Sequence, residues 1–333
     1  MKENRDFVDL SKLCFAFLII FLHVDNNNII IRNIAQYISR LGVPFFFAIS
    51  GYFFYKKVNY EKDLLSVMRK TIKRLIKLYL VWIAIYMPIL LKNFNESGNL
   101  KANIIKFVQE LLFKAPAFQW YTLALVVGIP ITAYIYNNKS FRDTIIILSV
   151  LYLIGCFGNT YLHILNLDNI FKNYLNIFLT TRNGLFFSPI FIFIGIAISK
   201  FEHKINKKIK YKEAYIICMI AYFFEVYLVQ SNQLKNDDCS MYITLPLVIT
   251  FMCIGILKNN INVKYSKEMR QLSTFIFCSQ YGFIFVTNIL INKILNLKIN
   301  SVIFLISIIF EITMSFIILK NTKYGRIVLD YIT

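Results

Sequence analysis

The feature that most constrains this chain is a succession of apolar runs separated by short polar stretches. Each run holds roughly twenty residues, the length that one helix needs to cross a bilayer core. Hydrophobic residues make up 57% of the chain and charged residues 17%, far from the balance of soluble proteins. The pattern predicts an all-α integral membrane protein, a bundle of about ten transmembrane helices. We place the spans at residues 7–25, 36–55, 75–91, 117–136, 143–162, 184–199, 212–230, 240–257, 272–291 and 299–319.

Lysine and arginine are distributed unevenly between the alternate polar segments. If the N-terminus is cytoplasmic, 25 of the 37 Lys and Arg residues fall in inner segments and 11 in outer ones, and Lys12 lies within the first span. Because basic residues concentrate in cytoplasmic loops, this predicts a multi-pass protein of the cell membrane with both termini in the cytoplasm. The net charge of +19 therefore indicates topology and attraction for anionic lipid, and we expect no nucleic-acid partner.

The polar segments are short, so we expect a single membrane-embedded domain over residues 1–333. The longest segment, about 92–116, combines a polar turn with an amphipathic helix, which we expect on the outer surface. We expect the first apolar run to be retained, because charges interrupt it and it lacks the cleavage site of a signal peptide. The six cysteines show no CxxC spacing, which predicts free thiols and no metal site.

Three residues with ionisable side chains interrupt the apolar run from Phe7 to Val24 in the first span, namely Asp9, Lys12 and His23. Such residues inside a span are a functional hypothesis by default, since hydrocarbon offers them no partner. On a regular helix Lys12 and His23 lie about 16 Å apart along the axis and about 20° apart around it. They could thus form one polar track, in which the imidazole acts as a base near neutral pH. The alternative is a buried histidine bonded to a backbone carbonyl.

Further candidates lie at the ends of other spans. Lys70, Arg74 and Lys77 share a helical face before the third span, where they can anchor lipid headgroups or hold substrate phosphates. Arg182 stands at the mouth of the sixth span, where it can snorkel or face inward to a polar acceptor. Glu225 lies deep in the seventh span and needs a partner there. No Gly-rich phosphate loop, metal-ligand spacing or nucleophile elbow is visible.

Four short motifs within the first 130 or so residues are similar to those of acyltransferase family 3. They are Lys12 and His23 with ten residues between them, preceded by Asp9; Arg40 followed by Val43-Pro44, Phe45-Phe46 and Ser50-Gly51-Tyr52; the series Arg74, Lys77, Tyr79 and Trp82; and Trp120-Tyr121 preceded by Gln119. An interfacial aromatic belt alone would also explain Trp120 and Tyr121. Two basic positions depart from the family pattern, because Lys12 and Lys77 stand where arginine is usual, and lysine lacks the bidentate fork.

The resemblance implies a ten-helix membrane acyltransferase that takes an acyl group, usually acetyl, from cytosolic acyl-CoA and delivers it to an outward-facing acceptor. It implies that His23 is the catalytic base and that Lys12, Arg74 and Lys77 contact the donor, with Tyr79 and Trp82 beside them. Arg40, Ser50, Trp120 and Tyr121 would then belong to the substrate site. Asp9 would either assist His23 or pair with Lys12.

Two further segments are similar to the branch of this family that contains the membrane part of vancomycin-type serine racemases, a part associated with serine uptake. They are Thr181 to Phe187 and Asp237 to Pro246. We expect no racemase domain in these residues and hence no racemase activity.

These observations predict a membrane O-acyltransferase that uses acetyl-CoA or another acyl-CoA as donor, with no metal. The expected acceptor is a hydroxyl of a cell-surface glycan or envelope precursor, and Arg182, Glu225 and Asp238 are candidates for the acceptor side. Two alternatives stay open at this point. One is a transporter of a small polar solute such as serine, and the other is a non-catalytic protein that keeps the scaffold.

Overall fold

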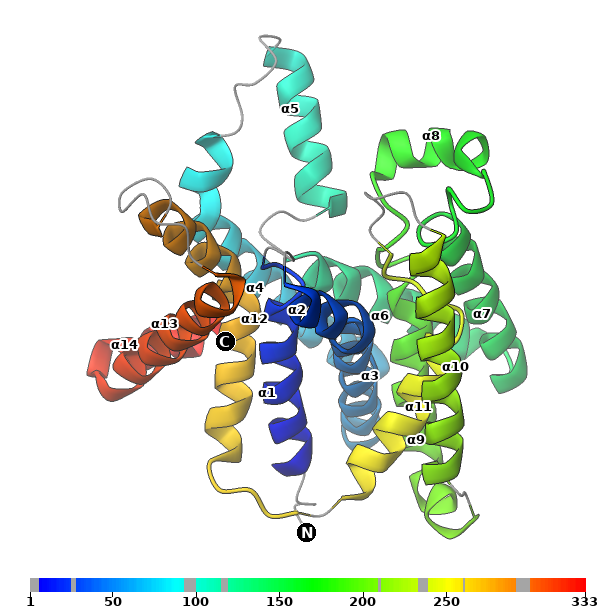
Figure 1. The fold of residues 1–333 in the computed structure, drawn as a ribbon. Helices are drawn as coiled ribbons and strands as arrows, with labels where there is room; N and C mark the ends of the chain where they lie inside the picture. Colours follow the sequence, from blue (N-terminus) through cyan, green and yellow to red (C-terminus); the bar gives the residue numbers. More distant parts are fainter. Residues whose placement is uncertain are drawn as a thin grey trace. The chain divides into compact units, whose positions relative to one another are not determined.

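A computed structural model describes residues 6–24, 28–92, 100–114, 119–208, 211–232, 239–259, 261–291 and 300–333. Within these ranges all regular structure is helical, and turns or short irregular segments connect the helices (Figure 1). The elements are α1 (Asp6–Ile20), α2 (Ile29–Asn33), η1 (Ile34–Ile38), η2 (Ser39–Leu41), α3 (Gly42–Glu61), α4 (Leu64–Lys92), α5 (Leu100–Gln109), η3 (Glu110–Lys114), α6 (Trp120–Asn138), α7 (Phe141–Phe157), α8 (Asp168–Phe178), α9 (Ser188–Lys208), α10 (Tyr211–Ser231), α11 (Leu245–Lys258), α12 (Ser266–Ile289), α13 (Ser301–Asn321) and α14 (Lys323–Ile332).

Each of the ten apolar runs expected as spans overlaps a long helix, and several of these helices extend beyond the expected bounds. Among the described residues, five helices are both long and apolar enough to cross a membrane. They are Ile29–Glu61, Leu64–Leu91, Tyr211–Ser231, Ser266–Ile289 and Ser301–Asn321. The all-helical, membrane-type fold is thus confirmed. The number of ten crossings and the cytoplasmic position of both termini stay predictions.

The chain divides into two compact units, and each is built from segments that are distant in the sequence. Unit 1 comprises Met1–Val43, Val81–Tyr86 and Ile256–Thr333, and unit 2 comprises Pro44–Leu80 and Met87–Gly255. The expectation of a single domain over residues 1–333 therefore stays a prediction.

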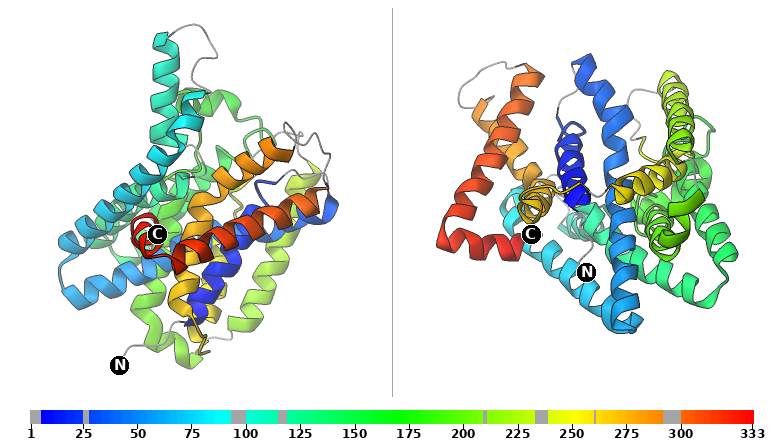
Figure 2. Two further views of the ribbon diagram at one scale, coloured as in Figure 1. Left: turned by 90° about the vertical axis from the view of Figure 1, so that its left-hand side faces the viewer. Right: turned by 90° about the horizontal axis from the view of Figure 1, so that it is seen from below.

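Unit 1 is organised on the pairing of α1 with α12, which run side by side from the same end (Figures 1 and 2). The carboxylate of Asp6, at the start of α1, accepts a hydrogen bond from the backbone N–H of Val263 at 3.2 Å, just before α12 begins. Helix α13 packs on α12, and α14 packs on α13. From α4, Tyr86 donates a hydrogen bond to the carbonyl of Cys278 at 2.7 Å and so fastens to α12.

Unit 2 contains a close crossing between α3 and α9 that requires glycine on both helices. A Cβ atom on Gly51 would overlap the carbonyl of Ile192, and one on Gly195 would overlap the carbonyl of Ala48. Small residues let two helix backbones approach in this way, so that van der Waals packing holds them together inside a membrane. The Ser50-Gly51 pair noted in the sequence therefore has a packing role.

Candidate functional site

The polar residues of the first span lie on α1 and on the turn that follows it. After α1 ends, three successive backbone N–H groups each donate a hydrogen bond to the carbonyl three residues earlier in the chain. The last of these bonds runs from His23 to Ile20 at 3.0 Å. Because this spacing is tighter than that of an α-helix, Lys12 and His23 are about 18 Å apart along the axis and roughly 80° apart around it. His23 is half-buried there. The expected angle of about 20° was wrong, since it assumed a regular helix as far as His23.

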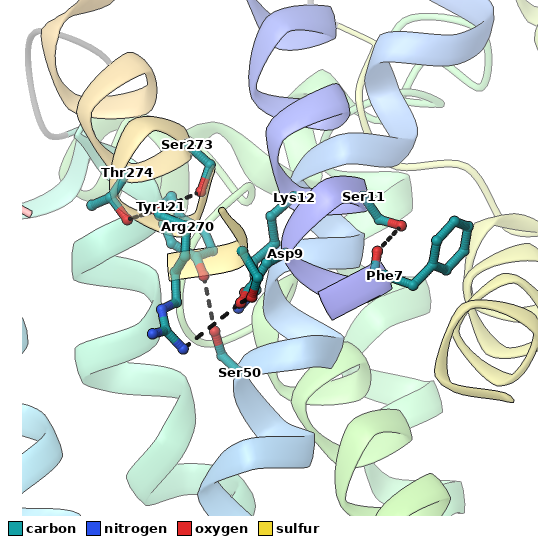
Figure 3. A network of polar contacts seen from close by, with 10 residues as sticks. Phe7, Asp9, Ser11, Lys12, Ser50, Tyr121, Arg270, Ser273 and Thr274 are labelled. Carbon is teal, nitrogen blue, oxygen red and sulfur yellow. Dashed lines mark hydrogen bonds and ion pairs between the residues drawn. The ribbon is translucent and has the colours of Figure 1, made fainter. Parts of the chain in front are cut away.

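Asp9 is the centre of a small ionic cluster in unit 1, which Figure 3 shows from close by. Its side chain is 8% exposed, and its Oδ1 lies 3.4 Å from the Lys12 ammonium. Its Oδ2 accepts a hydrogen bond from the Ser266 hydroxyl at 3.0 Å and lies 3.8 Å from Nη1 of Arg270. We call these four residues the Asp9 cluster.

The position of Asp9 can be compared with its two expected roles. It lies about 22 Å along α1 from His23, and its carboxylate pairs with Lys12 and Arg270. Ser266 and Arg270 were missed by sequence reasoning, which counted Arg270 only as an inner positive charge. Their 257-residue or longer separation from Asp9 offers no local signal.

Unit 2 holds two expected site residues, Trp120 and Tyr121, in an aromatic cluster that they form with Phe47 and Phe187. The ring centroids of Phe47 and Tyr121 are 4.7 Å apart, and those of Trp120 and Phe187 are 5.8 Å apart. The guanidinium of Arg182 lies over the Trp120 indole, 4.8 Å from the ring centroid. The Arg182 guanidinium therefore packs on an aromatic ring, and which of its two expected orientations it takes stays a prediction.

Ser50 contributes a hydroxyl beside the aromatic cluster. Tyr121 donates a hydrogen bond to the carbonyl of Phe46 at 3.3 Å, and the Ser50 and Tyr121 hydroxyl oxygens are 3.0 Å apart. The contact between Ser50 and Tyr121 is marked in Figure 3. A tyrosine hydroxyl has one hydrogen, so this arrangement makes Ser50 the donor to Tyr121. The two hydroxyls thus connect α3 to α6 and fix the phenol ring.

Asn183 determines how the neighbouring Arg182 is presented. Its Oδ1 accepts hydrogen bonds from the backbone N–H groups of Leu185 and Phe186, and its Nδ2 donates to the Tyr174 hydroxyl at 2.8 Å. Burial raises the pKa of the Tyr174 phenol above its ordinary value, and the hydrogen bond from Asn183 acts in the opposite direction. The asparagine therefore closes the turn that leads into α9 and ties it to α8.

Glu225 is engaged in a dense set of hydrogen bonds. Its carboxylate accepts from the Tyr161 and Thr244 hydroxyls and from the backbone N–H groups of Ile243 and Thr244, the latter two at 2.6 and 2.9 Å. These bonds join α10 to the segment that leads into α11. Asp238, the third residue expected on the acceptor side, lies outside the described residues.

The expected donor residues of α4 divide into two kinds. Arg74 and Lys77 are exposed, whereas Tyr79 and Trp82 are buried. Tyr79 donates a hydrogen bond to the carbonyl of Leu111 at 2.6 Å, and the Trp82 indole donates to the carbonyl of Ile332 at 3.0 Å. Both aromatic side chains thus hold neighbouring segments in place. Arg40, in η2, is half-buried in unit 1.

Within the described ranges, no group of three or more His, Cys, Asp or Glu side chains is arranged to hold a metal ion. Residues 5–320 match the family model described as an acyltransferase domain. The protein belongs to acyltransferase family 3. This establishes a membrane acyltransferase at the level of the family and confirms the resemblance found in the sequence motifs.

The chain is also similar to proteins named as racemases. It is 28% identical over 263 residues to an amino-acid racemase of Enterococcus faecalis, and the matched region covers 74% of this chain and 35% of that protein. A second amino-acid racemase from Enterococcus faecalis is 27% identical over 290 residues, 82% of this chain and 40% of the relative. A serine/alanine racemase of Enterococcus gallinarum is 28% identical over 281 residues, 83% of this chain and 40% of the relative. The chain therefore spans only about two fifths of these relatives. No solved structure matches it.

Proposed function

We propose that this family member transfers an acyl group, acetyl in the first instance, from acyl-CoA to a hydroxyl of a cell-surface glycan or envelope precursor. The observation that carries the proposal is the arrangement of α1, which holds the cation Lys12 near its middle and is followed by the imidazole of His23 beyond its C-terminal end. An acyl-CoA donor has the same polarity, since its phosphates and its thioester lie at opposite ends of the pantetheine arm. Lys12 then binds near the phosphates, and the thioester lies near His23.

In the proposed direct reaction, the neutral imidazole of His23 accepts the proton of the acceptor hydroxyl as its oxygen attacks the thioester carbonyl. A carbon–oxygen bond forms and the carbon–sulfur bond breaks. The CoA thiolate that leaves takes up the proton from the imidazolium, so the base is regenerated. The residues of this chain supply the proton transfer and hold the donor, and no metal is required by this scheme.

For the acceptor we propose the aromatic cluster of unit 2. A sugar ring presents apolar C–H faces that pack on aromatic rings, and polar hydroxyls that need hydrogen-bond partners. Trp120 and Tyr121 offer the rings, while Arg182 and Ser50 offer polar groups beside them. Glu225 acts on the acceptor side indirectly, through the segment before α11 that its carboxylate holds. Asp238 and Arg40 are proposed as further contacts of the acceptor. Arg74 and Lys77 either contact donor phosphates or anchor the protein to lipid headgroups.

The test is binding and slow hydrolysis of acetyl-CoA by the purified protein in nanodiscs. We expect Lys12→Ala to weaken binding and His23→Ala to abolish turnover while binding persists. His203→Ala is the matched control, because His203 is exposed near the end of α9 and has no proposed role. Full turnover in a folded His23→Ala variant would contradict the proposal.

The second candidate function is transport of a small polar solute such as serine. The names of the three relatives favour it, since all of them concern amino acids. If the folded wild-type protein binds no acetyl-CoA but takes up serine into proteoliposomes, transport replaces acyl transfer. We further propose that the protein is a multi-pass component of the plasma membrane with both termini in the cytoplasm.

A further inference from the structure

We propose that Arg270 of α12 binds the phosphates of the acyl donor together with Lys12, and that Asp9 is the positioning residue that holds both cations. This inference rests on the proposed acyl transfer and assigns a donor contact to a helix that the sequence motifs do not include. It follows from the charge, the distances and the exposure of the Asp9 cluster.

Charge is the first argument. One carboxylate, Asp9, has two cationic partners within 4 Å, Lys12 and Arg270. Counted over its four residues, the cluster therefore carries one positive charge in excess, beside a carboxylate that is almost entirely removed from solvent. Charges interact more strongly where water is excluded, so the surplus favours an anion at this place.

The geometry of Arg270 is the second argument. Its Nη1 lies 3.8 Å from the Asp9 carboxylate, which is longer than the roughly 2.7–2.9 Å of a charge-assisted hydrogen bond. Its side chain is 56% exposed, so the guanidinium is oriented by Asp9 but keeps N–H donors open to the outside. A guanidinium of this kind suits bidentate binding of a phosphate. The bidentate capacity that lysine lacks at position 12 is thus supplied by Arg270.

The third argument is the rigidity of the support. The Ser266 hydroxyl donates to the same oxygen of Asp9 that attracts Arg270, and Asp6 accepts the backbone N–H of Val263. Two acidic residues of α1 therefore fix the start of α12, and with it the position of Arg270. The N-terminal turn of α12 also points its positive dipole end to this region, which adds to the attraction for an anion.

The test compares two donors that carry the same thioester but differ in phosphate. Acetyl-CoA has the nucleotide and its phosphates, whereas S-acetylpantetheine has none of them. For the full-length protein in nanodiscs, we expect Arg270→Gln to weaken acetyl-CoA binding about tenfold or more and to change S-acetylpantetheine hydrolysis by less than about twofold. Arg270→Lys should recover part of the acetyl-CoA affinity.

Controls separate this inference from misfolding and from the proposed function itself. Lys267→Gln removes a neighbouring exposed cation and should change acetyl-CoA affinity by less than about threefold, because it lies outside the Asp9 cluster. Asp9→Asn should reduce the effect of Arg270→Gln, because the guanidinium then loses its anchor. If wild type binds acetyl-CoA and Arg270→Gln binds it equally well, this inference is overturned while acyl transfer stands. If wild type binds no acetyl-CoA, both fall. Equal losses on both donors would indicate a structural role and also overturn it.

Discussion

The indole N–H of Trp82 donates a hydrogen bond to the backbone carbonyl of Ile332, 3.0 Å away and 250 residues later in the chain. Trp82 belongs to a sequence motif that the family resemblance associates with the donor, and the bond gives it a defined task within unit 1. It fastens α4 to the last turn of α14. Its ring also lies 6.4 Å, centroid to centroid, from that of Phe275 on α12.

Replacing Trp82 by Phe should therefore destabilise the protein. The variant keeps an aromatic ring but leaves a buried carbonyl without its donor, which costs about 1–3 kcal/mol. Thermal unfolding in detergent, monitored by size-exclusion chromatography, measures the loss of stability as a lower midpoint temperature. Tyr324→Phe is the matched control, because that ring is 79% exposed on α14. Equal midpoints for the two variants would show that the bond contributes little.

Much of the fold could be predicted from the sequence, because a bilayer-length apolar run can satisfy its backbone only as a helix. The ends of the helices were less predictable. The run expected at 36–55 lies within the continuous helical stretch Ile29–Glu61, since backbone hydrogen bonding continues beyond the apolar boundary. The turn at His23 could not be predicted for the same reason, because hydropathy carries no information on where an α-helix gives way to a tighter turn.

The candidate site could be predicted only where its residues are close in the sequence. Asp9 and Lys12 are three residues apart, so their pairing was one of the expected alternatives. The contact of Asp9 with Arg270 depends on how α1 packs on α12, and no local pattern encodes that choice. Likewise Glu225 was known to need a partner, but the donors that satisfy it come from the separate segments around Tyr161 and Thr244.

The crossing of α3 and α9 gives a prediction for glycine. Gly195→Ala should destabilise the protein by about 1–3 kcal/mol or prevent its folding, since the new methyl group overlaps backbone that cannot move aside cheaply. Gly255→Ala is the control, because a Cβ there would sit 3.5 Å from the Tyr211 ring, an ordinary contact. Expression and thermal midpoints of the two variants in the same detergent make the comparison. A Gly195→Ala protein as stable as wild type would refute the close crossing.

Glu225→Gln should also lower the midpoint of thermal unfolding. All four partners of the carboxylate are donors, so the amide NH₂ group of glutamine faces donors and leaves at least one bond unmade. The expected loss is about 1–3 kcal/mol. Glu311→Gln is the control, because Glu311 accepts one bond, from Thr287 at 2.7 Å, which an amide oxygen can also accept. Similar midpoints for both variants would show that Glu225 is not needed to hold the segment before α11.

The pH dependence of acyl transfer tests the role of His23. A general base works only when neutral, so the rate should fall as the pH is lowered and the imidazole becomes protonated, and should level off at higher pH. Any residual activity of His23→Ala should lack this dependence. The profile is measured with saturating acetyl-CoA. The same acidic fall in His23→Ala would assign the titration to another group.

Arg182 and Trp120 give the last prediction, on the acceptor. The chain has two tryptophans, so in a Trp82→Phe background the fluorescence reports Trp120 alone. Arg182→Ala in that background should shift the emission, because the guanidinium leaves the indole face. Arg182→Lys should shift it as well, since an ammonium keeps the charge but not the planar stacking.

In an assay of acetyl transfer from acetyl-CoA to the acceptor, Arg182→Ala should raise the KM for the acceptor about tenfold and leave the hydrolysis of acetyl-CoA unchanged. A change in hydrolysis with no change in acceptor KM would place Arg182 with the donor instead. Loss of both activities in a protein with a normal thermal midpoint would mean that the aromatic cluster serves the whole reaction, and the assignment of Arg182 to the acceptor alone would have to be given up.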